Sequence, residues 1–277
     1  MGNCKYCGKP AGLLKSEHIE CAEKYRNGKK LMIETAKEAA LGRKDKETLQ
    51  DWLSGIAAES YISTANIKLS LIEGFSKAVE QSLEDGVLSK EEENSLVQYK
   101  NQFSLTQDEL DSHNGSYSRL AKAAILRDVL EGKIPERVKV QGQLPFNFQK
   151  DEKLVWLFTG VDYFEQRIRT HFEGGSQGVN IRVAKGVYYR VGAFRGNPVQ
   201  TTETILADRG FLAITNKHIY FSGSTKKFRV QYNQIMEFTP YDDGIGIQKD
   251  SASAKPQVFK TGDGWFTYNI VVNLSRI

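Results

Sequence analysis

The chain has 277 residues, of which 40% are hydrophobic and 26% are charged. These totals exclude a single small domain and a disordered chain, and they predict a soluble protein of two or three domains. The net charge of +4 permits contact with nucleic acid or anionic lipid without requiring either. No apolar run approaches the roughly 18 residues of a membrane helix, and the polar start lacks a signal-peptide core. The three cysteines are odd in number and clustered as ligands would be, so we expect a protein of the reducing cytoplasm.

The most specific pattern is CKYCGKPAGLLKSEHIEC, residues 4–21. All three cysteines of the chain and one of its four histidines fall in this stretch. Two residues separate Cys4 from Cys7, and two separate His18 from Cys21, so that each pair can reach a single ion. Three thiolates and one imidazole complete a tetrahedron around Zn²⁺ and leave no position for water. The spacing therefore predicts a structural zinc site made by these four residues.

The residues between the ligands indicate how the ligands are presented. Gly8 supplies the turn of a zinc knuckle, and Ser16 is a candidate N-cap for a helix that starts with His18 and Cys21 on one face. A thioredoxin-type redox pair would need a surrounding βαβ pattern, which is missing. A zinc deaminase places a glutamate two residues after its histidine, as Glu20 is here, but its paired cysteines follow that histidine.

This arrangement resembles the treble-clef zinc finger family over residues 1–30. The resemblance implies a structural zinc and a small interaction module, and such fingers bind nucleic acid, protein or neither. The module is rich in basic residues, which leaves nucleic-acid binding open as an alternative. The basic residues are Lys5, Lys9, Lys15, Lys24, Arg26, Lys29 and Lys30.

Residues 31–140 form a predicted helical domain. No proline occurs in the region until Pro135, and apolar residues recur at helical spacing. The first apolar stripe is Leu49, Trp52, Leu53 and Ile56, and the second is Ile72, Phe75 and Val79. The stretch SLEDGVLSKEEENSL loosely resembles TerB-like helical domains, in which such a turn joins two helices.

Two capping boxes mark helix starts in this region. Ser89 stands three residues before Glu92, and Thr106 stands three residues before Glu109, so that hydroxyl and carboxylate can satisfy backbone donors reciprocally. Leu88 and Leu105 precede the caps as staple residues, and glycines mark the ends of helices. These glycines are Gly86 and Gly132.

Residues 141–277 form a predicted antiparallel β domain. Short β-branched and aromatic runs such as GFLAIT, KHIYFSG and KFRVQY are separated by turn residues, with Lys185-Gly186 and Asn216-Lys217 at hairpin positions. The last segment, DGWFTYNIVVNLSRI, fits a strand by alternation and a helix by its spacing of apolar residues. With Asp263 as a fair N-cap, we predict a helix.

The segments GFLAITNKHIYFSG, KFRVQYNQIMEFTPYDDGIGIQ and PQVFKTGDGWFTYNIVVNL resemble the bacterial pleckstrin-homology (PH) or GRAM-like superfold over residues 150–277. The resemblance implies a β-barrel closed by a C-terminal helix, with Trp265 and Phe266 plugging its open end. It also implies a module that binds lipid, peptide or protein. The predicted fold class is α+β, with a zinc finger, a helical middle and a PH-like barrel.

A glycine-rich stretch, EGGSQGVNIRVAKGVYYRVGAFRG, carries several basic residues. It lacks the Gly-Lys-Ser/Thr of a P-loop, and a loop between strands is its plainest interpretation. The functional interpretation is a site for an anion or a lipid headgroup. Its residues would be Arg182, Lys185, Arg190 and Arg195.

No catalytic signature is visible elsewhere in the chain. There is no Gly-x-Ser-x-Gly elbow, and His113, His171 and His218 have no evident partner in the sequence. We therefore expect a non-enzymatic bacterial adaptor, sensor or regulator that acts through a protein partner or ligand. The alternatives are a peripheral lipid-binding protein and a nucleic-acid-binding protein acting through the finger. The sequence does not predict an oligomeric state.

Overall fold

The structure is a computed structural model of residues 1–277. It describes all residues except 1, 13–14, 46–47, 85, 113, 141, 174–175, 185–186, 195–196 and 252–253, and it describes the rest of 167–202 by backbone alone. The chain divides into two compact units, Met1–Gly132 and Lys133–Ile277. The predicted domain boundaries at residues 30 and 140 stay predictions.

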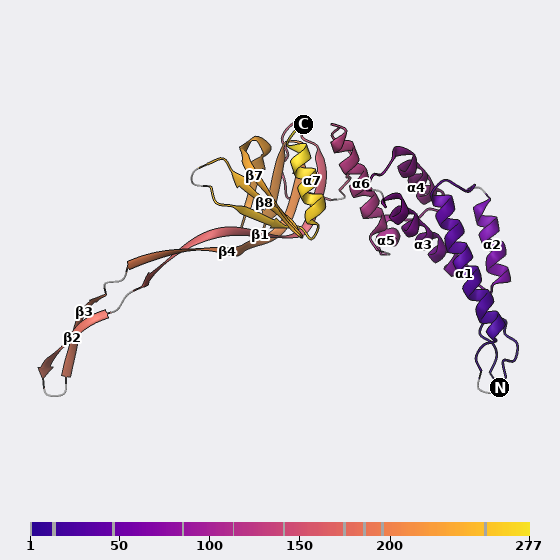
Figure 1. The fold of residues 1–277 in the computed structure, drawn as a ribbon, viewed down its shortest axis with the longest axis horizontal. Helices are drawn as coiled ribbons and strands as arrows, with labels where there is room; N and C mark the ends of the chain where they lie inside the picture. The colour runs from indigo at the N-terminus through magenta and orange to yellow at the C-terminus, as the bar shows by residue number, and fades with distance from the viewer. Residues whose placement is uncertain are drawn as a thin grey trace. The chain divides into compact units, whose positions relative to one another are not determined.

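The first unit is helical. Its helices are α1 (Ile19–Ala40), α2 (Leu49–Glu59), α3 (Thr64–Ser82), α4 (Lys90–Gln102), α5 (Gln107–Asp111) and α6 (Ser116–Leu130). The N-terminal loops lead directly into α1, which continues without a break into the helical core (Figure 1). In the described part of the chain, no helix combines the length and apolarity needed to cross a membrane.

The core of this unit forms where α1 and α3 pack closely. Met32 and Ala36 of α1 and Phe75 and Val79 of α3 are all buried in one cluster. Gly74 makes this approach possible, because a Cβ atom there would come within 2.5 Å of the Ala36 Cβ. The predicted apolar stripes thus face the core, apart from Trp52 and Ile56 of α2, which are only partly covered.

Both predicted capping boxes are confirmed. The Ser89 hydroxyl accepts a hydrogen bond from the Glu92 amide, and the Thr106 hydroxyl accepts one from the Glu109 amide. In each box the glutamate carboxylate in turn accepts a hydrogen bond from the backbone amide of the cap residue. The staple residues preceding the caps are buried. Gly86 and Gly132 adopt positive φ angles of 76° and 74° just after helices, the conformation predicted for them.

The second unit is an antiparallel sheet with one helix. Its long central pair is β1 (Leu154–Glu173) and β4 (Asn197–Thr215), and between them in sequence come β2 (Ser176–Ala184) and β3 (Val187–Phe194). The remaining elements are β5 (His218–Gly223), β6 (Lys227–Gln231), the 3₁₀ turn η1 (Tyr232–Gln234), β7 (Ile235–Tyr241), β8 (Gly244–Lys249), β9 (Gln257–Lys260) and α7 (Gly264–Leu274).

The strand order β6-β5-β4-β1-β9-β8-β7 makes a seven-stranded sheet, and β2 and β3 pair separately. The predicted closed barrel is wrong, because β6 and β7 are the two edges of this sheet and do not pair. Only the turn η1 joins these edges, so the sheet must curve strongly to bring them near each other. Tyr232 of this turn is buried, and its hydroxyl donates a hydrogen bond to the Thr215 carbonyl at 2.8 Å.

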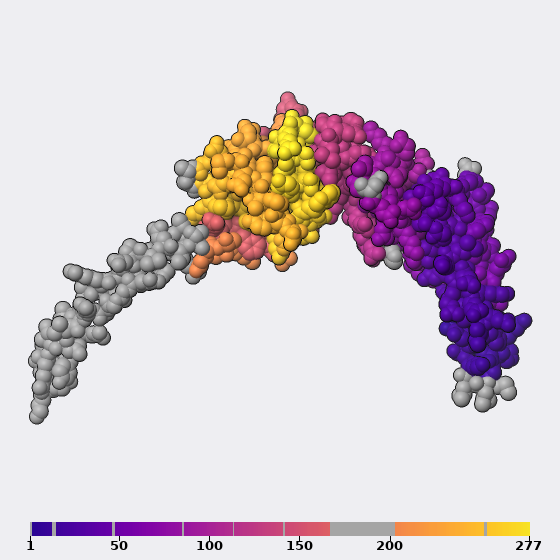
Figure 2. Space-filling view, viewed as in Figure 1, coloured from indigo at the N-terminus to yellow at the C-terminus, as the bar shows by residue number. Residues whose placement is uncertain are grey.

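The C-terminal segment is a helix, as predicted. Asp263 caps α7 by accepting a hydrogen bond from the Phe266 amide at 3.1 Å. The helix packs on β7 and β8, and the C-terminal residues, yellow in Figure 2, are visible on the face that the view shows. Phe266 is buried against Trp156 and Phe158, but Trp265 is 66% exposed, so its predicted role as a plug is wrong. Neighbouring helical residues point about 100° apart, which lets only one of them face the sheet.

Candidate metal centre

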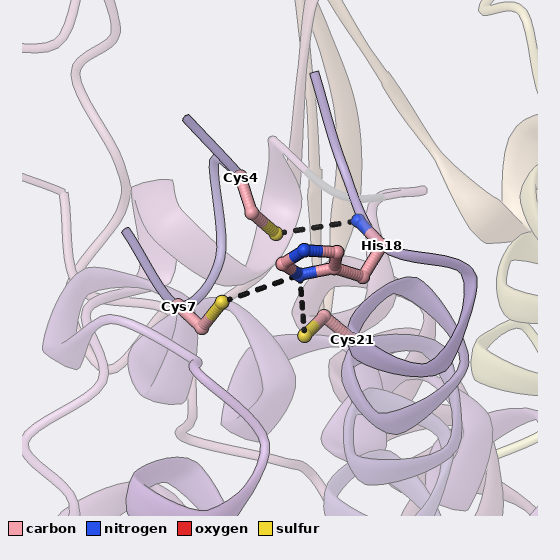
Figure 3. Close-up of side chains that lie close together, drawn as sticks. All are labelled: Cys4, Cys7, His18 and Cys21. Atoms are coloured by element: carbon pink, nitrogen blue, oxygen red, sulfur yellow. Dashed lines mark hydrogen bonds between the residues drawn. The ribbon is translucent and has the colours of Figure 1, made fainter. Parts of the chain in front are cut away.

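Four side chains converge at the N-terminal end of α1. The ligand atoms of Cys4, Cys7, His18 and Cys21 all lie within 4.8 Å of one another. The Nδ1 atom of His18 lies 3.4 Å from the Cys7 sulfur and 3.7 Å from the Cys21 sulfur (Figure 3). The structure therefore brings together all four residues that the sequence grouped.

The His18 ring has a defined orientation. Its Nε2 atom lies 3.0 Å from the Pro10 carbonyl oxygen, so Nε2–H donates to that oxygen and Nδ1 is left to face the sulfurs. Such an outer hydrogen bond fixes the tautomer and orientation of a metal-ligating histidine. The His18 backbone N–H also donates to the Cys4 sulfur at 3.4 Å.

A short knuckle presents the first two cysteines. The Gly8 amide donates to the Cys4 carbonyl at 2.9 Å, and the Cys4 amide donates to the Lys9 carbonyl at 2.7 Å. Gly8 has a φ of 71°, which permits this tight turn. Asn3 and Pro10 form an isolated antiparallel bridge behind it.

The second pair of ligands comes from the start of α1. The predicted N-cap at Ser16 is wrong, because α1 begins at Ile19 and His18 is the N-cap. The Ser16 carbonyl accepts a hydrogen bond from the Lys5 amide at 2.9 Å, which ties Ser16 to the knuckle. His18 keeps an extended backbone, and Cys21 follows within the first turn of the helix.

The local environment shifts the ionisation of the ligands. Burial opposes ionisation of Cys4, but hydrogen bonds from the backbone N–H groups of Cys7, His18 and Tyr6 outweigh it and lower the pKa of the thiol to about 6. Burial and the neighbouring thiols raise the pKa of Cys21. Cys4 therefore ionises readily, whereas Cys21 needs a nearby cation to become a thiolate.

The site has one further neighbour that the sequence did not indicate. Tyr61, in the loop between α2 and α3, hydrogen-bonds to Cys21, and this contact raises the pKa of the Tyr61 hydroxyl. Tyr61 has a positive φ of 57°, which is uncommon for a residue with a side chain. Thirty-nine residues separate it from Cys21, so no local pattern could have placed it there.

The donor set fits zinc. With Zn–S bonds of about 2.3 Å and a Zn–N bond of about 2.05 Å, a tetrahedral ion separates its sulfur and nitrogen ligands by about 3.6 Å. The two distances from His18 Nδ1, 3.4 and 3.7 Å, bracket that value. All four donors come from the chain itself, as in a closed structural site.

The predicted anion site cannot be placed in the same way. Lys185 and Arg195 lie outside the described residues, and Arg182 and Arg190 are described by backbone alone, on β2 and β3. The prediction for these four residues therefore falls on a part of the chain whose side chains the structure does not describe.

A second polar cluster, in the sheet unit, was missed by sequence reasoning. The Glu152 carboxylate lies 2.9 Å from His218 Nδ1 and accepts a hydrogen bond from the Tyr220 hydroxyl at 2.7 Å. It also accepts from the Thr215 hydroxyl and from the Gln149 amide. His218 is thus partnered, although no residue near it in sequence indicated this. The cluster fastens the segment before β1 onto the β4–β5 turn.

No protein-family model matches this chain, and no curated protein matches it.

Proposed function

We propose that the N-terminal module is a treble-clef-like zinc finger whose metal is structural. The observation that carries this proposal is the convergence of Cys4, Cys7, His18 and Cys21 on one point, with the His18 tautomer fixed by Pro10. Bound there, zinc supplies a cross-link between the knuckle and α1. A module of about thirty residues has little core of its own, so the metal contributes much of its folding free energy.

We propose that the sheet unit is a PH-like binding module. Support comes from its order of strands, in which consecutive strands are neighbours on each side of the long β1–β4 pair, and from the terminal α7 packed on β7 and β8. Its edges are joined by η1 and remain unpaired, so the unit is an open variant of the barrel that the resemblance implies.

Together, these units favour a protein that acts by binding. The metal site offers four protein ligands and no open coordination position, which suits an adaptor, sensor or regulator in a cytoplasmic setting. The alternative of nucleic-acid binding is favoured by one specific feature of the first unit, a basic groove between α1 and α3. The lipid alternative has no such support among the described side chains.

Elemental analysis of the purified full-length chain tests the zinc proposal. We expect one zinc per chain in the wild type and in Tyr61→Phe, a control that alters a neighbour of Cys21 but no ligand. The double variant Cys4→Ser, Cys21→Ser should lose the metal. A wild-type content far below one per chain, or full retention in the double variant, would contradict a four-ligand site.

A further inference from the structure

A groove of about 440 Å³ lies between α1 and α3. Arg26, Lys29 and Lys30 line it from α1, and Lys77 lines it from α3. The buried Ile33 lies one turn further along α1, on the same face as Arg26, Lys29 and Lys30. The groove is therefore a concave surface with cations gathered on one wall.

Each carboxylate of the groove has a lysine partner. Glu34 pairs with Lys37, which also lies 3.5 Å from Glu38, and Glu73 pairs with Lys77 at 3.8 Å. In the described part of the chain, Arg26, Lys29 and Lys30 form no ion pair with any carboxylate. Like charges three and four residues apart destabilise a helix, and an anion bound among them would remove that cost.

An aromatic pair lies beside the cations. Tyr25 lines the groove, and its ring centroid is 5.0 Å from that of Tyr6 in the zinc knuckle. The Tyr25 hydroxyl accepts a hydrogen bond from Asn66 of α3 at 3.4 Å, which holds the ring in place. Aromatic rings beside a track of cations are the elements that bind single-stranded nucleic acid, where bases stack and phosphates pair with Lys and Arg.

We infer that this groove binds the phosphodiester backbone of single-stranded nucleic acid, with Arg26, Lys29 and Lys30 on the phosphates and Tyr25 beside a base. The inference rests on the nucleic-acid alternative for the function and assigns it a site on α1 and α3, next to Tyr6 of the knuckle. A groove of about 440 Å³ has the size of a nucleotide site.

Fluorescence anisotropy with a labelled oligothymidylate of about 12 nucleotides tests the inference on the full chain. If three phosphates are neutralised, affinity should fall about 20-fold between about 50 mM and about 200 mM salt. The double variant Arg26→Gln, Lys30→Gln should bind at least about tenfold more weakly at the lower salt. Arg26→Gln alone should show an intermediate loss, which keeps the test valid if the double variant folds poorly.

The matched control is Lys15→Gln, Lys24→Gln. It removes the same charge from two exposed residues of the N-terminal region that do not line the groove. Affinity within about twofold of the wild type supports the groove. If this control loses as much affinity as the groove variant, the groove is refuted while nucleic-acid binding stands. If the wild type does not bind, both the groove and the nucleic-acid function fail.

Two competitors check the class of ligand. An oligoglutamate of equal length should compete at least about tenfold less well than unlabelled oligothymidylate, because it offers neither phosphates nor bases. ATP at the same phosphate concentration should likewise compete poorly, since its directly linked phosphates are more closely spaced than the phosphates of a strand. Equal competition by oligoglutamate would overturn the nucleic-acid assignment, and equal competition by ATP would overturn the assignment to a strand.

Discussion

Replacing Glu152 with alanine should strongly destabilise the sheet unit. The Glu152 side chain is fully buried, and its carboxylate accepts hydrogen bonds from Tyr220, Thr215 and the Gln149 amide. It also lies 2.9 Å from Nδ1 of His218, whose side chain is 5% exposed. After truncation, the buried donors on β4 and β5 cannot reach water.

The expected magnitude follows from this burial. Removing one partner of a buried, hydrogen-bonded charged group costs about 3–5 kcal/mol, because the remaining groups lose their partner without gaining solvent. At about 1.4 kcal/mol per factor of ten, this corresponds to a loss of about 100- to 4000-fold in the protection of amide hydrogens that exchange through unfolding of the unit.

Hydrogen exchange with mass spectrometry is the suitable assay, because it resolves the two units. Tryptophan fluorescence would mix them, since Trp52 lies in the first unit and Trp156 in the second. Peptides covering Leu212–Phe221 should lose protection in Glu152→Ala. The control is Glu136→Ala, which removes an exposed carboxylate paired with Lys153 in the same segment and should change protection by less than about threefold. Protection that is unchanged in Glu152→Ala, or lost equally in the control, would refute the reasoning.

The same carboxylate predicts an acid dependence. Burial opposes ionisation of Glu152, but hydrogen bonds from Thr215, Tyr220 and Gln149 outweigh it, so the pKa of Glu152 in the fold lies below its ordinary value. A depressed folded-state pKa contributes stability that is complete above about pH 4.3 and is lost as the pH falls through the folded value. Melting of Glu152→Gln should therefore be less sensitive to acid than melting of the wild type, and equal sensitivity would contradict this account.

Five further substitutions test the helix cap and the packing. Ser89→Ala should destabilise α4 by about 1 kcal/mol through loss of its capping box, measured by hydrogen exchange of that helix; no change would count against the cap. Gly74→Ala should cost about 1–3 kcal/mol in urea unfolding because of the close approach of α1. Gly55→Ala, which meets no atom within 4 Å, should instead stabilise by up to about 1 kcal/mol, and equal signs would contradict the packing argument. Phe266→Ala should lower the free energy of unfolding by about 3–5 kcal/mol, whereas Trp265→Ala should lower it little. Similar losses for the two variants would support the predicted role of Trp265 as a plug.

Local signals predicted several helix starts well. A helix cap is a hydrogen bond between residues three or four positions apart, so both partners can be recognised in the sequence. This is true of the caps at Ser89, Thr106 and Asp263. The four-residue metal cluster was predictable for a related reason, because paired ligand spacings are themselves local. Ser16 failed as a cap because a hydrogen bond from Lys5 holds its backbone in the knuckle.

The sheet unit was less predictable. The alternation in β1 is broken where its register with β4 shifts between Phe158 and Val161, with Gly160 at a φ of 66°, so this long strand did not stand out. The partnership of Glu152 with His218 spans 66 residues and depends on the fold that brings them together. The open edges at β6 and β7 could not be predicted from η1, a three-residue turn without a distinctive sequence.

X-ray absorption at the zinc edge of the purified protein measures the central claim most directly. The account predicts three sulfur neighbours at about 2.3 Å and one imidazole nitrogen at about 2.0–2.1 Å, supplied by Cys4, Cys7, Cys21 and His18. Loss of one sulfur in Cys21→Ser would agree with it. Two or fewer sulfurs in the wild type, or a water oxygen in the first shell, would contradict a closed structural site.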